Sequence, residues 1–324
     1  MPERRDRTAV VVVRLLRPEY TLTSLSAASR VVPHKLLADL RAARGRQLPL
    51  EAVLHEWRLC PLSGGRNSDV FQWGEVCLKL YRKTDKNRVA REWHGLNHVA
   101  GLGLAPQPLW RDDHPDQPAL GMSFVPGRPI PELTNPELVL PWIAAATGAM
   151  QALPMAEPLA SWPRVDSITH YIARLTDIWP QQLAAADDAH TGKMRTLLDR
   201  WEASGDVGLL RRPTPAVFSR GDANLLNWLS ENEGLHVVDF EFSGWSDRAV
   251  DAADHIEHIS ARQVPDSTWR TLEDDFGVNR QNRSRFAAAR RTIALRWLAV
   301  LWRRRDEREP EFLAQLDRVC ALFS

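Results

Sequence analysis

Two carboxylates and one amide lie close together in the sequence around residue 230. Asp222 precedes Asn227 by five residues, and Asn227 precedes Asp239 by twelve. The turn-forming residues 232–234 between two apolar segments predict a hairpin that would bring Asn227 beside Asp239. Their oxygen atoms suit magnesium, and Asp222 would face the same space as a base for a hydroxyl group. The alternative is that these side chains only make turn and capping contacts, as Asp and Asn often do.

A second group of candidate residues lies upstream. Gly64 and Gly65 stand in a polar loop between two predicted strands, where backbone amides can approach a phosphate closely. Lys79 follows in an alternating segment and is one of only five lysines, so it is either a compact charge for phosphate or a solvated strand residue. Glu92 lies in a predicted helix and could form an ion pair that fixes Lys79.

Taken together, these motifs resemble the aminoglycoside phosphotransferase and choline kinase group, which are small-molecule relatives of the protein kinases. The resemblance covers about residues 54–262. It implies that Asp222 orients the acceptor hydroxyl and accepts its proton, and that Asn227 and Asp239 hold Mg²⁺ on the phosphates of ATP. It also implies that Lys79, held by Glu92, contacts the α- and β-phosphates.

Further positions follow from the same resemblance. Residues 122–127 match the hinge between the two lobes, which implies adenine contacts with the backbone around Ser123 and Val125. Asp251 would support the catalytic loop without taking part in the chemistry. Arg220 stands where the family usually has a histidine that packs beneath the loop, so the support of the loop is in question. Arg220 could pair with Asp251 or with an incoming phosphate.

The secondary-structure pattern predicts an α+β fold in which a small sheet with one packed helix precedes a larger helical part. The resemblance implies a two-lobed protein-kinase-like fold with an antiparallel sheet in the first lobe. We expect an N-terminal extension of open role (1–52), a nucleotide-binding N-lobe (53–125) and a helical C-lobe with the catalytic loop and acceptor site (126–324). The predicted strands include 9–16, 54–62, 70–73, 76–81 and 120–125. The predicted helices are 33–43, 85–100, 137–153, 168–186, 193–204, 249–262, 284–302 and 310–322.

Composition excludes several classes of protein. The 42 basic and 41 acidic residues give a net charge of +1, so no global charge favours nucleic acid or a membrane as partner. Three scattered cysteines exclude a disulfide framework and fit a reducing cytosol, and we expect a cytoplasmic protein with neither signal peptide nor membrane span. The arginines of residues 280–308 indicate an amphipathic helix with a solvated basic face. His255 and His258 are interpreted as surface or packing residues, not as a metal pair.

We therefore expect an ATP- and Mg²⁺-dependent phosphotransferase that acts on a hydroxyl group of a small molecule. The acceptor could be an aminoglycoside, an aminosugar, a choline-like compound or another metabolite or antibiotic. Cationic acceptors need carboxylates, and the candidates are Asp247, Asp254, Glu257, Asp274 and Asp275. The alternative function is a nucleotide-binding pseudokinase that serves as a scaffold or sensor.

Overall fold

The computed structural model describes residues 26–62, 67–82, 87–186, 188–231 and 234–324. The predicted strand at 9–16 and the glycines Gly64 and Gly65 lie outside these ranges. Among the described helices, none has both the length and the apolar character that a membrane crossing requires.

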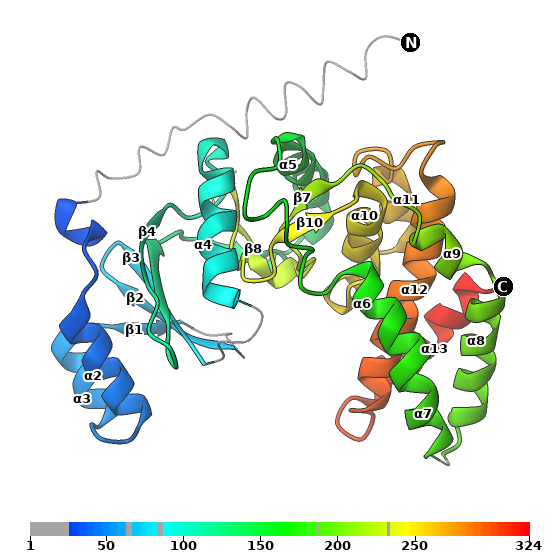
Figure 1. The fold of residues 1–324 in the computed structure, drawn as a ribbon, viewed down its shortest axis with the longest axis horizontal. Coiled ribbons are helices and arrows are strands. Elements are labelled where there is room, and N and C mark those ends of the chain that lie inside the picture. Colours follow the sequence, from blue (N-terminus) through cyan, green and yellow to red (C-terminus); the bar gives the residue numbers. More distant parts are fainter. Residues whose placement is uncertain (1–25, 63–66, 83–86, 187, 232–233) are drawn as a thin grey trace, which may run out of the picture.

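The first part of the fold is an antiparallel sheet of five strands in the order β1-β2-β3-β5-β4. The strands are β1 (Cys60–Leu62), β2 (Ser68–Trp73), β3 (Val76–Tyr81), β4 (Pro108–Asp112) and β5 (Ala119–Ser123). Helices α2 (His34–Arg44) and α3 (Leu50–Trp57) lie on one side of this sheet, and α4 (Arg88–Val99) lies on the other (Figure 1).

Alternation along β3 divides its side chains between the two faces of the sheet. Leu78 and Leu80 belong to the core shared with α2 and α3, whereas Tyr81 packs in the core that includes Leu96 of α4. Because successive strand residues point to opposite faces, Lys79 points toward α4. The sequence pattern of β3 therefore turns Lys79 into the interior of the molecule and not toward solvent.

The prediction of a strand over residues 54–62 is wrong for most of its length. Residues 50–57 form helix α3, and only β1 is extended. Val53, Leu54 and Trp57 recur at helical spacing and pack against the sheet, which explains why an apolar segment folds as a helix here. Helix α3 ends at Arg58, whose φ of 52° is left-handed.

The second part of the fold is mainly helical. Its helices are α5 (Leu140–Ala152), α6 (Ile168–Ala173), α7 (Trp179–Ala184), α8 (Thr191–Ala203), α9 (Asp206–Leu210), α10 (Arg248–Glu257), α11 (Asp266–Leu272), α12 (Arg283–Trp302) and α13 (Glu309–Leu322). Short strands interrupt them: β6 (Arg128–Pro129), β7 (Val217–Ser219), β8 (Trp228–Glu231), β9 (Gly234–Val237) and β10 (Gly244–Ser246). The predicted hairpin is confirmed, because β8 pairs antiparallel with β9. The predicted helices match within a few residues, except that 249–262 ends earlier as a helix.

Helix α12 is the central helix of this part, with α10 and α13 packed against it. Arg283, at the start of the helix, is more than half exposed. For the other four arginines of α12 the expectation of a solvated basic face is wrong. They form mostly buried ion pairs with acids on other elements, because α12 is covered on several sides and its cations need partners there. These pairs are Arg285–Asp247 (2.9 Å), Arg290–Glu257 (2.8 Å), Arg291–Asp206 (2.6 Å) and Arg296–Asp166 (3.0 Å).

Candidate functional site

The loop after β7 carries Asp222 and is shaped by a glycine that no other residue could replace without strain. Gly221 has a φ of 80°, and a Cβ atom built there would lie 2.2 Å from the carbonyl oxygen of Phe242. The hydroxyl oxygen of Ser219 accepts a hydrogen bond from the Gly221 N–H at 3.1 Å. The chain therefore turns sharply just before Asp222 and packs tightly on the segment that follows Asp239.

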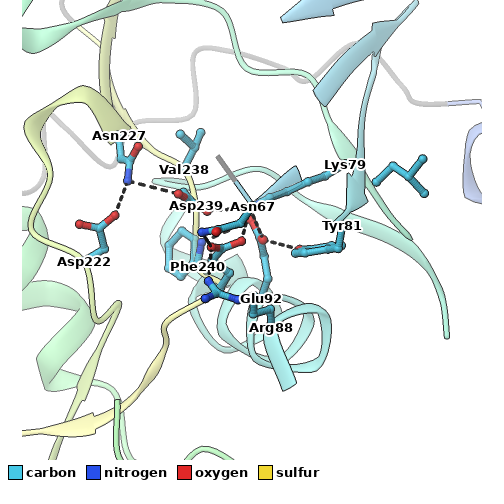
Figure 2. A network of polar contacts seen from close by, with 12 residues as sticks. Asn67, Lys79, Tyr81, Arg88, Glu92, Asp222, Asn227, Val238, Asp239 and Phe240 are labelled. Atoms are coloured by element: carbon cyan, nitrogen blue, oxygen red, sulfur yellow. Dashed lines mark hydrogen bonds and ion pairs between the residues drawn. The ribbon is translucent and has the colours of Figure 1, made fainter. Parts of the chain in front are cut away.

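The three residues predicted from spacing do converge in the structure. The Asn227 Nδ2 atom donates to Asp222 Oδ2 at 2.8 Å and lies 3.5 Å from Asp239 Oδ2 (Figure 2). The other Asp222 oxygen accepts from the backbone N–H of Asn224 at 2.9 Å. Asn227 ends a 3-10 turn directly before β8, and the Val238 N–H donates to its carbonyl oxygen at 2.9 Å. The hairpin thus places Asn227 between the two carboxylates.

Lys79 joins the sheet to this hairpin. Its Nζ atom lies 2.7 Å from Glu92 Oε2, 2.6 Å from Asp239 Oδ1 and 3.2 Å from Glu241 Oε2. The residue is only 6% exposed. Burial alone would lower the pKa of Lys79, but the negative charges of Asp239 and Glu92 raise it well above its ordinary value. Lys79 is therefore a charged ammonium group at neutral pH, and the interpretation as a solvated strand residue is wrong.

Glu92 connects helix α4 to both Lys79 and the loop of Asp239. Besides its contact with Lys79, it accepts hydrogen bonds from the hydroxyl group of Tyr81 and from the Phe240 N–H, the latter at 3.3 Å (Figure 2). Burial raises the pKa of Glu92, an effect opposed by Lys79. For Asp239, burial would raise the pKa, but the ammonium of Lys79 lowers it.

Glu241 belongs to the same network, although no role for it was expected from the sequence. Its Oε1 atom accepts from Asn67 Nδ2 at 2.7 Å and from the Arg88 guanidinium at 2.6 Å. The signal available in the sequence was the second acid of Asp-Phe-Glu, two residues after Asp239. Glu241 is buried and connects the residue before β2, helix α4 and the Asp239 loop, with Lys79 on its other oxygen.

Arg220 holds the loop of Asp222 through backbone carbonyl groups and forms no hydrogen bond or ion pair with Asp251. Its guanidinium donates to the carbonyl oxygens of Asp222, of Val238 at 3.3 Å and of Asp239 at 3.1 Å. It also lies over the ring of Trp228, 5.9 Å from the centroid. Arg220 is buried and spans the two loops that carry the site. The guanidinium group of arginine carries several N–H donors in one plane, so one side chain can donate hydrogen bonds to both loops.

Asp251 lies behind the loop, where the resemblance placed it as a support. Its Oδ1 atom accepts from Arg164 and from the Ser219 hydroxyl group, each at 3.0 Å, and its Oδ2 atom accepts from Gln151 at 3.1 Å. Because Ser219 in turn accepts from the Gly221 N–H, the position of the loop depends on this buried carboxylate.

Ser123 is the last residue of β5, and Val125, the other residue predicted to contact the adenine, lies two residues beyond it. The Ser123 N–H donates to the Gln107 carbonyl oxygen at 2.9 Å, and the Phe124 N–H donates to that of Glu75 at 2.7 Å. Both N–H groups are therefore engaged within the fold. Val125, which follows them, is half-buried.

The model of the phosphotransferase enzyme family (APH) matches residues 58–288, which contain every described residue of the network. No curated protein sequence matches the chain significantly.

Solved structures with the same fold include small-molecule kinases. A choline/ethanolamine kinase family protein from Mesorhizobium loti is 20% identical, with a TM-score of 0.62 over 89% of this chain and 95% of that one. A thermostable mutant of the aminoglycoside phosphotransferase APH(4)-Ia, bound to ADP and hygromycin B, is 15% identical with a TM-score of 0.60 (84% and 97% covered). An aminoglycoside 2'-phosphotransferase mutant in complex with GDP is 14% identical with a TM-score of 0.61 (83% and 94% covered).

These likenesses establish a kinase-like fold, and the family model extends over more than two thirds of the chain. The chain therefore belongs to the phosphotransferase enzyme family and is a small-molecule phosphotransferase.

Proposed function

We propose that this protein transfers the γ-phosphate of ATP to a hydroxyl group of a small molecule in a magnesium-dependent reaction. The observation that carries the proposal is the convergence of Asp222, Asn227 and Asp239 with the buried pair Lys79–Glu92, all joined by contacts of 2.6–3.5 Å. Phosphoryl transfer needs positioning and charge neutralisation more than covalent chemistry, and these groups can supply both.

Asp222 is proposed as the residue that orients the acceptor hydroxyl and takes its proton. Its carboxylate is partly exposed, and donors on the loop and on Asn227 fix its orientation. Lys79 is proposed to contact the α- and β-phosphates from the position in which Glu92 holds it. A charged ammonium group at this place favours the negative phosphates.

Asn227 and Asp239 fit a magnesium ion by their chemistry. The partly exposed carboxylate of Asp239 lies 3.5 Å from Nδ2 of Asn227. Carboxylate and amide oxygens are ligands that magnesium takes in proteins, so Asn227 would present Oδ1, and not Nδ2, to the ion. When bound, the ion would neutralise charge on the phosphates. Glu92, Asp239 and Glu241 also lie close enough together to suggest a cation site, but Lys79 Nζ already contacts all three.

The nucleotide is proposed to lie against the end of β5. Because the N–H groups of Ser123 and Phe124 are engaged, we propose that Ser123 contributes its carbonyl oxygen and Val125 its peptide group to the base. The complexes of APH(4)-Ia with ADP and AMP-PNP support ATP, whereas the GDP complex of another neighbour makes GTP the competing nucleotide to measure. Gly64 and Gly65 stay proposed as phosphate-binding residues.

The domain limits are likewise proposals. We assign residues 53–125 to nucleotide binding and residues 126–324 to the catalytic loop and the acceptor. Helix α3 spans residue 52, and it packs with α2 on the sheet. We therefore propose that the described end of the 1–52 segment stabilises the sheet.

The acids available for a cationic acceptor are fewer than the sequence suggested. Asp247 pairs with Arg285 at 2.9 Å, Asp254 with Arg164 at 2.5 Å, and the buried Glu257 with three arginines. Neutral hydroxyl compounds are therefore as reasonable as cations, and the test needs both. Hygromycin B is bound together with ADP in the named neighbour complex.

The experiment is a panel of acceptors incubated with γ-labelled ATP and Mg²⁺, with aminoglycosides, aminosugars, choline and neutral sugars as members. We expect transfer of the label to one class of acceptor by the wild type and not by Asp222→Asn. Tight ATP binding without labelled product from any acceptor would favour the pseudokinase. A protein that binds no nucleotide would overturn the proposal as a whole.

A further inference from the structure

A buried histidine lies directly behind the proposed base. His258 is the residue after α10, is 8% exposed, and places its Nε2 atom 3.8 Å from Asp222 Oδ1. Packing, the role expected from the sequence, accounts for only part of its surroundings. Its ring packs edge to face on Trp297 of α12, with ring centroids 4.8 Å apart, so its orientation is fixed by the core of the helical part.

The hydrogen bonds of the other ring nitrogen determine where the proton of a neutral ring is. The Ser260 backbone N–H donates to His258 Nδ1 at 3.2 Å, and the Ser260 hydroxyl oxygen lies 2.7 Å from the same nitrogen. A nitrogen that accepts from an N–H group carries no proton of its own in the neutral imidazole. The proton therefore resides on Nε2, which is the nitrogen that faces Asp222.

The same serine also connects the histidine to the catalytic loop. The Leu225 N–H donates to the Ser260 hydroxyl oxygen at 2.9 Å, which leaves the hydroxyl proton available for His258 Nδ1. Leu225 stands between Asp222 and Asn227 in the sequence. The histidine and the loop that carries the proposed base are thus held by one serine, which fixes their relative position.

Building on the proposed function, we propose that His258 is a positioning residue that directs its Nε2–H group at Asp222 Oδ1 and holds the carboxylate toward the acceptor. The 3.8 Å separation is longer than a hydrogen bond, and such contacts commonly shorten when the substrates bind. Asn227, the side-chain donor to the other Asp222 oxygen, is shared with the proposed metal site. The donor of His258 is directed at Asp222 alone.

The charge state of His258 agrees with this role. Burial lowers the pKa of His258, and the nearby positive charges of Arg296 and Arg220 lower it further, against the opposite effect of Asp222 and Asp254. The ring is therefore neutral at neutral pH, with one proton to donate.

Two substitutions separate hydrogen-bond donation from packing. His258→Gln keeps an N–H donor near the Nε2 position but loses the ring, whereas His258→Phe keeps the ring on Trp297 but loses the donor. The rate of ADP release from Mg·ATP is the measurement. For His258→Phe we expect kcat to fall about 10-fold while KM for ATP is unchanged. For His258→Gln we expect kcat to stay within about threefold of the wild type. His190→Phe, whose ring packs on Phe312, is the control that should leave kcat unchanged. The reverse order of the two His258 variants would assign the residue to packing and overturn the proposal.

A spectroscopic measurement keeps this proposal separate from the proposed function. In ¹⁵N-histidine-labelled protein, long-range ¹H–¹⁵N spectra should identify His258 as the Nε2–H tautomer, and Asp222→Asn should shift its Nε2 resonance. A proton on Nδ1, or an Nε2 resonance that does not shift in Asp222→Asn, would refute the contact between His258 and Asp222 even if the enzyme is active. If the wild type and Asp222→Asn release ADP equally, the role of Asp222 fails, and with it the positioning role of His258, whatever the tautomer.

Discussion

We expect Lys79 and Glu92 to act as one unit in catalysis, because Glu92 fixes the ammonium group of Lys79 at 2.7 Å, besides accepting a hydrogen bond from the Phe240 N–H. In a double-mutant cycle, Lys79→Met and Glu92→Gln should each lower kcat/KM by roughly 10²-fold. The double variant should lose little more than either single variant, which corresponds to a coupling energy of about 2–3 kcal/mol. The exposed pair Lys35–Glu56, separated by 3.6 Å, is the control and should leave kcat/KM unchanged. Additive losses would show that the two residues work independently.

Asp239 occupies a backbone conformation that limits which variant is informative. Its φ of 68° is left-handed, a region that Asn tolerates far better than Ala, so Asp239→Asn removes the charge with little strain. The variant should lose roughly 10-fold or more of the Mg²⁺-dependent gain in ATP affinity, because the main anionic ligand is gone. Calorimetric titrations with and without Mg²⁺ measure this gain. An undiminished gain would mean that Asp239 does not bind the metal.

At the scale of elements, the docking of α4 on the Asp239 loop decides whether Glu92 reaches Lys79. A Cβ atom on Gly95 would lie 2.6 Å from Ser243 Oγ and 3.2 Å from Phe240 Cβ. We expect Gly95→Ala to destabilise the protein by about 1–3 kcal/mol and to raise KM for ATP, since the helix must move away. Urea unfolding and kinetics measure the two effects.

Gly148→Ala is the matched control for this prediction. Gly148 lies in α5, and a Cβ atom built on it would have no neighbour within 4 Å, so alanine should be neutral or stabilise the helix by up to about 1 kcal/mol. Equal effects of the two substitutions would contradict the close packing of α4.

The elements that position the site were partly predictable from the sequence. Alternation identified β3, the turn residues identified the β8–β9 hairpin, and Pro33 and Gly45 bracketed α2. The prediction of a strand where α3 lies is wrong because an apolar segment of eight residues is too short for its periodicity to distinguish a helix from a strand. The carbonyl contacts of Arg220 depend on where distant backbone oxygens lie, which local sequence does not encode.

At the scale of the whole molecule, buried ion pairs connect the helices of the second part of the fold. Glu257 of α10 is fully buried and pairs with Arg262 at 3.0 Å, Arg290 at 2.8 Å and Arg318 at 2.7 Å. Burial alone would raise the pKa of Glu257, but the hydrogen bonds and charges of these arginines lower it. Arg262, Arg290 and Arg318 therefore have a structural role as the buried counter-charges of Glu257.

We expect Glu257→Gln to lower the free energy of unfolding by about 3 kcal/mol at pH 7, because three arginines lose their buried counter-charge. A depressed pKa stabilises the fold above the unfolded value near 4 and stops doing so as the pH falls through the folded value. The difference between wild type and variant should therefore shrink below about pH 4. Urea unfolding at several pH values measures it, and a difference independent of pH would argue against an ionised Glu257.

The most direct test of the central claim is Asp222→Asn, measured for both turnover and ATP affinity. Asparagine keeps an oxygen for the Asn224 N–H but cannot accept the proton of the acceptor. We expect ATP binding within about twofold of the wild type and turnover lower by ~10²-fold or more. Turnover equal to that of the wild type would contradict the assignment of Asp222 as the base.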